Sequence, residues 1–177
     1  RIRIDANKKP DEEGDIKEFE NAKMKELLNV LEETEGKVII WANWVHSLKM
    51  IIQELKKKYG DKSVVAIYGE IPGQEREEAV DKFQKDDKTR FFISNPQTGG
   101  YGLTLTEANT VIYFSNNYDL EQRQQSEDRA HRIGQENKVL YIDLVAEKTV
   151  DESVIRALNQ KIKLSAETLG EDVLAYL

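Results

Sequence analysis

The sequence lacks cysteine altogether and contains only two histidines, so the chemistry open to it is narrow. Without cysteine there is no disulfide and no thiolate ligand, which agrees with a reducing compartment. His46 and His131 are too few for a zinc cluster, so we expect no metal site built by this chain alone. No apolar run approaches a membrane span and no signal-peptide pattern is present. We therefore expect no membrane contact and a cytoplasmic or nuclear location.

A surplus of basic residues is also missing. The net charge is −7, with 33% charged and 39% apolar residues. Such a chain does not coat nucleic acid by bulk attraction, although a local contact strip stays open. At 177 residues it is large enough to bury a core as one domain. The sequence starts at Arg1 and not at methionine, so we expect a piece of a longer protein.

Short apolar segments alternate with amphipathic ones along the chain. The segments that predict strands are 38–42, 64–68, 90–94, 110–114 and 139–145. The segments that predict helices are 15–31, 45–59, 75–84, 121–132 and one from about residue 151. Most of the strand segments are continuous apolar runs, which is typical of strands buried on both faces of a parallel sheet. The sequence therefore predicts an α/β fold, a doubly wound, mostly parallel β-sheet flanked by helices on both faces.

This alternation divides the chain into three parts. Residues 1–14 are short and charged, so we interpret them as an N-terminal linker or strap. Residues 15–148 form the α/β lobe, and residues 149–177 form a C-terminal helix that packs on the lobe or on a neighbour. Thr149 and Glu152 have the spacing of a capping box for that helix. Doubly wound folds bind ligands at the loops after the strand C-termini, so we expect functional side chains at this loop edge.

The most informative part of the sequence is an arginine-rich stretch of eleven residues that begins at Gln125. If it is helical, Gln125, Arg129 and Arg132 share one face. Two permanently charged guanidinium groups on one face suit the oxygens of a polyphosphate. The alternative is a solvated helix face on which Glu127 and Asp128 neutralise the arginines.

The stretch closely resembles motif VI of the SNF2-type helicases and translocases, Gln-x-x-Asp-Arg-x-His-Arg-Ile-Gly-Gln. The resemblance implies the C-terminal RecA-like lobe of a superfamily 2 DNA-dependent ATPase. It implies catalytic arginine fingers at Arg129 and Arg132 and an ATP contact at Gln125. We expect both guanidinium groups to project from the loop edge of the sheet into a gap that another lobe completes.

A glycine-rich segment, Gly99-Gly100-Tyr101-Gly102, follows the predicted strand 90–94. By itself it indicates either a tight turn or a cradle whose backbone N–H groups approach a phosphate. The segment resembles SNF2 motif V, Gly-Gly-x-Gly-x-Asn-Leu-x-x-Ala, with Thr104 in place of the usual Asn. The resemblance implies that Gly100 and Gly102 lie on the ATP side, and that Thr98 and Gly99 contact a DNA phosphate.

Two further segments carry the resemblance. Residues 37–44 resemble motif IV, and Trp44 lies just beyond the predicted strand, where it either stacks on a base or packs against the helix 45–59. Residues 68–83 resemble the segment between motifs IV and V, whose strand-end glycine lies near a nucleic-acid phosphate. This implies nucleic-acid contacts for Gly69 and Arg76, although an ion pair on its own helix also explains Arg76.

The resemblance covers residues 37–152 and departs from the family pattern at one place. Where the family usually has Asp-x-x-Trp-Asn-Pro, residues 115–120 read Ser-Asn-Asn-Tyr-Asp-Leu. A DNA or inter-lobe contact through the missing Asp and Trp is therefore not predicted. Compact SNF2-like proteins of phages and mobile elements show similar changes, which favours a phage or bacterial source.

Two motifs that a complete motor needs are absent from the sequence. It has no Gly-x-x-x-x-Gly-Lys-Ser/Thr loop for phosphate and no Asp-Glu-x-His box for magnesium. We therefore expect ATP and Mg²⁺ to need a missing N-terminal RecA-like lobe of the same protein, and the chain alone to be inactive. The other expected partner is double-stranded DNA. Two alternatives remain: a lobe of another superfamily 2 motor, such as an RNA helicase or a restriction enzyme, and a non-catalytic module that binds DNA or protein.

Overall fold

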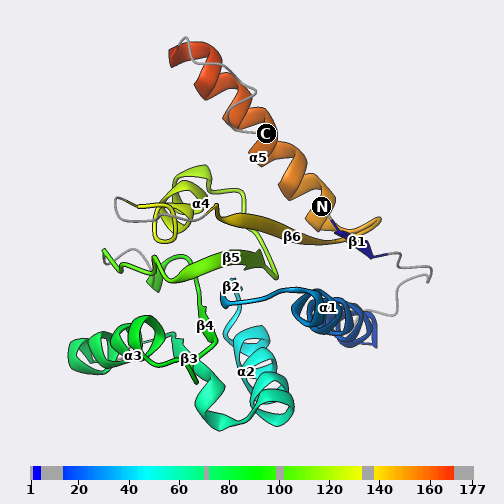
Figure 1. Cartoon of the computed structure of the whole chain (residues 1–177). Helices are drawn as coiled ribbons and strands as arrows, with labels where there is room; N and C mark the ends of the chain where they lie inside the picture. The colour runs from blue at the N-terminus through cyan, green and yellow to red at the C-terminus, as the bar shows by residue number, and fades with distance from the viewer. Residues whose placement is uncertain (1, 5–13, 70–71, 99–101, 133–137, 170–177) are drawn as a thin grey trace.

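The computed structural model describes residues 2–4, 14–69, 72–98, 102–132 and 138–169. These residues build one parallel sheet of six strands in the order β1-β6-β5-β2-β4-β3 (Figure 1). The strands are β1 (Ile2–Ile4), β2 (Lys37–Trp41), β3 (Val64–Ile67), β4 (Phe91–Ser94), β5 (Ala108–Tyr113) and β6 (Leu140–Ala146). The helices are α1 (Gly14–Glu33), α2 (Val45–Tyr59), α3 (Gly73–Lys85), α4 (Leu120–Glu127) and α5 (Val150–Leu169), with a 3-10 turn at Asp61–Ser63.

Helices cover both faces of this sheet, as predicted. Figure 1 shows α1 and α2 on one side and α3 and α4 on the other. Alternate residues of β2 serve the two sides: Val38 and Ile40 join the core under α1 and α2, whereas Ile39 and Trp41 join the core under α3. Every residue of β4 is buried. The continuous apolar runs in the sequence therefore have the physical cause inferred for them, burial on both faces.

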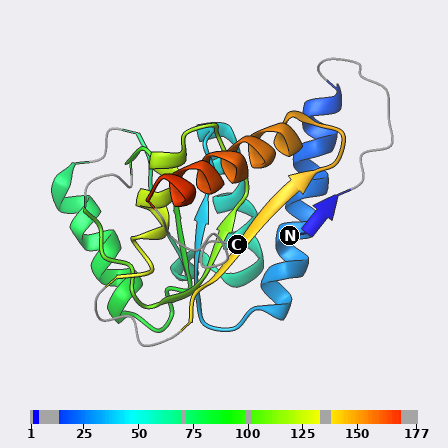
Figure 2. The same ribbon diagram turned by 90° about the horizontal axis from the view of Figure 1, so that it is seen from above.

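The five predicted strands are confirmed within a few residues at each end. The sixth, β1, is not predicted from the sequence, which indicated only a linker or strap for residues 1–14. Ile2–Ile4 pairs in parallel with β6, and Figure 2 shows the two side by side. A strand of three residues is too short to leave a periodic pattern, so its pairing is decided by the neighbouring edge of β6.

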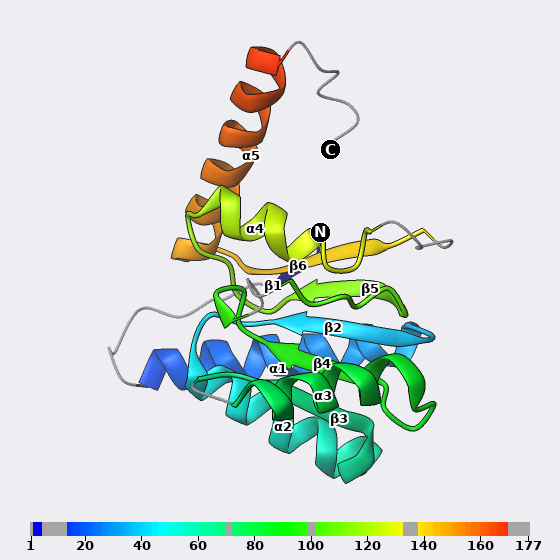
Figure 3. The same ribbon diagram turned by 90° about the vertical axis from the view of Figure 1, so that its left-hand side faces the viewer.

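The C-terminal helix α5 begins with the predicted cap. The hydroxyl of Thr149 accepts a hydrogen bond from the N–H of Asp151 at 3.2 Å, which is the bond expected of an N-cap residue. The first half of α5 packs on the lobe through Val154, Ile155 and Leu158. Its second half leads away from the sheet, as Figure 3 shows. Among the described residues no helix is both long enough and apolar enough to cross a membrane.

Candidate nucleotide and nucleic-acid sites

The helix that carries the arginine-rich stretch is shorter than predicted. α4 starts at Leu120, where the carboxylate of Asp119 accepts a hydrogen bond from the N–H of Gln122, and it ends at Glu127. The N–H of Ala130 then bonds to the carbonyl of Glu127 at 3.1 Å, which is the tighter i to i+3 pattern. The predicted helix to residue 132 is therefore wrong. The chain turns because Ala130 is drawn into the core under α3.

The end of α4 changes the geometry of the proposed clamp. Gln125 is exposed on the helix, where its side-chain amide donates to Glu121 at 3.0 Å. Arg129 and Arg132 follow the helix in a turn and a bend, so the three side chains do not share one helical face. The prediction of a single face was wrong, because it required five more helical residues, 128–132, than the backbone supplies.

The turn after α4 joins two motifs that lie far apart in the sequence. The N–H of Leu105 donates to the carbonyl of Arg129 at 3.0 Å. The guanidinium of Arg132 donates to the hydroxyl of Thr104 at 2.7 Å and to the carbonyl of Gly102 at 3.4 Å. Gly102, Thr104 and Leu105 thus form one structural unit with the arginine segment. Thr104, which stands where the family usually has Asn, still supplies an oxygen to Arg132.

The two arginines differ in their surroundings. Arg132 is exposed, whereas Arg129 is half-buried and its Nε atom is buried without a hydrogen-bond partner. A buried N–H of a permanent cation costs free energy unless a partner satisfies it. A buried donor without a partner needs an explanation, and a role in binding or catalysis is one that buried polar groups have in native proteins.

The arginines do not lie at the loop edge where the strands end. Leu105, which contacts Arg129, lies three residues before the first residue of β5, Ala108. In Figure 3, α4 runs from the edge where β5 ends back toward the edge where β6 begins. The expectation that both guanidinium groups project from the loop edge was therefore wrong. A helix that follows a strand in an α/β fold returns along the sheet, and it carries its C-terminal residues to the opposite edge.

The nucleic-acid candidates, in contrast, follow the ends of three parallel strands. Trp44 lies just after β2 and is 70% exposed, so it does not pack into α2. Gly69 follows β3 in an exposed turn with a φ of +70°, a conformation that favours glycine. Thr98 follows β4, and its N–H donates to the side chain of Asn95 at 2.7 Å. Strands that run in parallel end at the same edge, so these residues share one side of the lobe.

A second aromatic residue stands at this edge. The N–H of Asn43 donates to the hydroxyl of Ser115 at 2.9 Å, and its side-chain amide donates to the Ser115 carbonyl at 3.3 Å. These bonds tie the loop after β2 to the loop after β5. Tyr118, on the second of these loops, is 49% exposed. It occupies the position of the family's Trp, so an aromatic side chain is retained there.

The remaining candidates are less informative. Arg76 is half-buried on α3, and the carboxylate of Asp81 on the same helix pairs with Lys85 at 3.0 Å. Gly99 and Gly100 lie outside the described residues. Within the described ranges, no cluster of three His, Cys, Asp or Glu side chains could hold a metal ion.

A buried polar network, which sequence reasoning missed, fixes α4 against the sheet. The guanidinium of Arg123 donates to Asp143 of β6 at 2.5 Å, to Glu127 at 2.6 Å and to Asn116 at 2.8 Å. It also lies over the ring of Tyr113, 3.4 Å from the centroid, and its side chain is only 11% exposed. Ser126 is the one buried residue of α4, so this helix is held by polar contacts where most helices use apolar ones.

Two tyrosines beside this network have pKa values raised above the ordinary value of tyrosine, chiefly by burial. Burial raises the pKa of Tyr113 far above its ordinary range, more than the guanidinium of Arg123 lowers it. Burial, with the nearby carboxylates of Glu127 and Asp128, raises the pKa of Tyr141 to about 12. Tyr141 donates its hydroxyl proton to the carbonyl of Glu127 at 3.2 Å, so it also anchors the end of α4.

The raised pKa values predict a loss of stability in alkali. The unfolded chain loses its tyrosine protons at a pH of about 10, before the folded chain does, so the free energy of unfolding falls as the pH rises above about 10. Below that pH the contribution is fully present. Urea unfolding between pH 8 and about 12 measures this, and Tyr141→Phe should lessen the slope. A free energy of unfolding that stays constant over this range would contradict the shifts.

Comparison with known proteins assigns the chain to a family. Residues 21–134 match the model described as helicase conserved C-terminal domain, which is more than half of the chain. The chain belongs to this family.

Curated relatives of this helicase C-terminal domain are ATP-dependent helicases. A protein of Mycoplasma genitalium named as an uncharacterized ATP-dependent helicase, MG018, is 32% identical over 165 residues, 91% of this chain and 16% of its own length. The mouse DNA annealing helicase and endonuclease ZRANB3 is 33% identical over 151 residues, 83% of this chain and 14% of its own length. The fission yeast ATP-dependent helicase fft2 is 29% identical over 154 residues, 84% of this chain and 12% of its own length.

Solved structures agree with the sequence relatives. The C-terminal part of the Fun30 ATPase domain superposes with a TM-score of 0.72 at 26% identity, over 77% of this chain and 45% of that one. The Sulfolobus solfataricus SWI2/SNF2 ATPase C-terminal domain gives a TM-score of 0.60 at 26% identity, over 77% of this chain and 55% of that one. The SNF2-type resemblance and the RecA-like α/β fold are thus confirmed. The chain spans only 12% to 16% of the length of the three curated relatives.

Proposed function

We propose that the chain is the second motor lobe of an SNF2-type, ATP-dependent DNA translocase. In this proposal ATP lies between this lobe and a P-loop lobe, which also holds Mg²⁺. Arg132 and Arg129 neutralise charge that develops on the transferred phosphoryl group, as arginine fingers do. Gly102 belongs to the same site through its contact with Arg132, whereas Gln125 stands apart on the helix.

The observation that carries the proposal is the junction between the two motifs. The bond from Leu105 holds the backbone carbonyl of Arg129, and the bonds to Thr104 and Gly102 hold the guanidinium of Arg132, so both arginines lie against residues 102–105. Arg129 keeps a buried donor without a partner at this place. A solvated, self-neutralised helix face, the alternative from the sequence, has no reason to bury such a donor.

The DNA track in this proposal is a separate surface. Trp44, Gly69 and Thr98 lie where the strands end, whereas the arginines lie toward the start of β5. Two distinct surfaces allow nucleotide and DNA to be bound at the same time. Closure of the two lobes around ATP would then move the track along DNA, and hydrolysis would reopen it.

The deciding experiment measures ATP hydrolysis by the full-length protein, and by this chain mixed with its separately purified P-loop lobe. We expect duplex DNA to stimulate hydrolysis that neither lobe shows alone. Stimulation by RNA and not by duplex DNA would assign the lobe to an RNA helicase. Absence of hydrolysis in both preparations would instead favour a non-catalytic module.

Replacement of Trp44 tests the DNA track. Trp44→Ala in the full-length protein should weaken duplex binding about tenfold, because the large apolar side chain loses its contact with the sugars and groove edge of the duplex, and burial of such a side chain contributes about 1.5–3 kcal/mol. Trp44→Phe keeps an aromatic face and should retain most of the affinity. Fluorescence anisotropy with a labelled duplex measures both. Because Trp44 is 70% exposed, neither variant should change the thermal midpoint of the chain. Equal affinity of the alanine variant and the parent would remove Trp44 from the track.

A further inference from the structure

One edge strand of the sheet, β3, is short but lacks the charge, proline and bulge that also protect such edges. β3 pairs with β4 over Val64–Ile67, and among the described residues no strand pairs with its other side. Exposed edges are normally protected by charge, proline, a bulge or a covering segment. β3 contains neither a charged residue nor proline, and its register with β4 is unbroken. The strand at the opposite edge, β1, is three residues long and carries Arg3.

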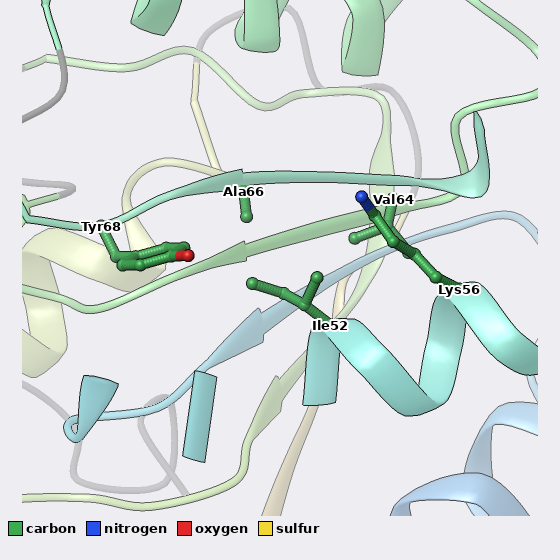
Figure 4. A pocket seen from close by; sticks show the side chains of 5 residues that line it. All are labelled: Ile52, Lys56, Val64, Ala66 and Tyr68. Carbon is green, nitrogen blue, oxygen red and sulfur yellow. The ribbon is translucent and has the colours of Figure 1, made fainter. Parts of the chain in front are cut away.

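A surface cavity of about 380 Å³ lies beside this edge (Figure 4). It is lined by Ile52 and Lys56 of α2 and by Val64, Ala66 and Tyr68. Val64 and Ala66 are two residues apart, so they project from the same face of β3. In Figure 4 the amino group of Lys56 lies near Val64, and the ring of Tyr68 lies at the far end. An extended segment paired with β3 would place an alternate side chain into this cavity, whose floor is apolar.

Lys56, which lines the cavity, belongs to a lysine-rich stretch of the chain. α2 ends with Lys56, Lys57 and Lys58, and Lys62 follows just before β3. Lys58 is held by an ion pair with Glu32, whereas the side chains of Lys57 and Lys62 are exposed. One acid, Asp61, lies within this stretch. In a chain of net charge −7 this is a local positive patch, and it complements a negatively charged partner.

We propose that the β3 edge is a docking site for an acidic peptide segment in extended conformation. The segment adds to the sheet as a strand, inserts one apolar or aromatic side chain into the cavity, and places carboxylates near Lys56 and Lys62. Duplex nucleic acid offers the same charge, but it uses neither a strand edge nor an apolar cavity. A second copy of the chain would present another lysine-flanked edge and lacks the acidic complement. None of the residues that line this cavity belongs to the ATP site proposed above.

The test uses the whole 177-residue chain and a fluorescent probe peptide of sequence Asp-Glu-Asp-Val-Phe-Val-Asp-Glu-Asp. We expect binding with a Kd on the order of 10⁻⁵ M. Three matched peptides separate the contributions of charge, cavity filling and strand pairing to binding. The first has Asn and Gln in place of Asp and Glu, the second has alanine in place of phenylalanine, and the third has methyl groups on alternate backbone nitrogens. Each should bind at least about tenfold more weakly, because each removes charge, cavity filling or the strand ladder.

Two variants locate the site on the protein. Lys56→Glu and Ala66→Leu, which fills the cavity, should each weaken probe binding about tenfold. Lys25→Glu changes an exposed lysine on α1, a helix that contributes no residue to the cavity lining, and should have little effect. Because Ala66→Leu could disturb folding, amide exchange provides a second readout on the parent chain. The N–H groups of Val64–Ile67 should exchange more slowly when the probe is bound.

Four results would overturn the proposal. The first is no binding at probe concentrations up to about 1 mM, which excludes even a weak peptide site. The second is equal binding of the backbone-methylated peptide, which excludes strand addition. The third is displacement of the probe by duplex DNA with loss of DNA binding in Lys56→Glu, which assigns the patch to nucleic acid. The fourth is a dimer of the chain that Ala66→Leu abolishes, which assigns the edge to a second copy.

Discussion

Replacing Arg132 by alanine in the full-length protein should lower DNA-stimulated ATP hydrolysis by about 10³–10⁵-fold. An arginine finger contributes a factor of about this size, because it stabilises charge that develops in the transition state. The side chain of Arg132 is exposed, and its described bonds reach only Thr104 and the carbonyl of Gly102. The lobe should therefore remain folded. Steady-state ATP hydrolysis with saturating duplex DNA measures the loss, and circular dichroism checks the fold.

Two comparisons sharpen this prediction. Arg156→Ala removes an exposed arginine on α5 and should leave hydrolysis unchanged. Thr104→Val keeps Arg132 but removes the hydroxyl that accepts its hydrogen bond, so it should give a smaller loss, about tenfold, through misplaced charge. Near-normal hydrolysis by Arg132→Ala would count decisively against a finger role. The family assignment would survive that result, because it rests on the match of residues 21–134.

Replacing Arg123 by methionine should cost about 3 kcal/mol in the free energy of unfolding. The substitution leaves the carboxylate of Asp143, whose side chain is 15% exposed, without its guanidinium partner. Breaking a buried ion pair from one side costs about 3–5 kcal/mol, and the remaining hydrogen bond from Asn116 keeps the loss near the lower value. Urea unfolding of the 177-residue chain measures it.

The matched control is Lys85→Met, which removes one member of an exposed ion pair with Asp81 on α3. Exposed pairs of this kind contribute about 0–1 kcal/mol, so little stability should be lost. Combining Arg123→Met with Asp143→Leu should restore part of the loss, because no unpaired charge then remains buried. If Arg123→Met and Lys85→Met were equally stable, the polar network would not be what holds α4.

Much of the fold could be predicted from the sequence, because local pattern and burial coincide in it. Each of the five longer strands is a run of apolar, largely β-branched or aromatic residues. β4, with all of its residues buried, shows why such runs predict a sheet covered on both faces. The spacing predicts Thr149 as the cap of α5, and its hydroxyl accepts a backbone hydrogen bond, from Asp151 and not from the Glu152 of the predicted capping box. Trp44 was placed just past a strand end, where it is exposed.

The candidate site could be predicted only in part. The residue types of the site follow from a contiguous motif. The end of α4 at Glu127, however, depends on two tertiary contacts: Ala130 is buried in the core, and the N–H of Leu105 donates to the carbonyl of Arg129. Neither contact leaves a periodic signal near residue 127. The network around Arg123 was missed for a similar reason. Its partners lie far apart in the sequence, because Asn116 follows β5 and Asp143 is in β6. The parallel pairing of β5 with β6 brings the two side chains together.

The sequence by itself determined the class of fold, the order of the strands along the chain and the family of the lobe. All three are encoded in local patterns and contiguous motifs. The tertiary structure decided which motifs meet. It brought Gly102 and Thr104 to Arg132, placed the arginines away from the edge that carries Trp44, and left β3 as an edge without charge or proline. The physical reason is that hydrogen bonds between distant segments depend on how the strands and helices pack against each other. Local sequence does not specify that packing.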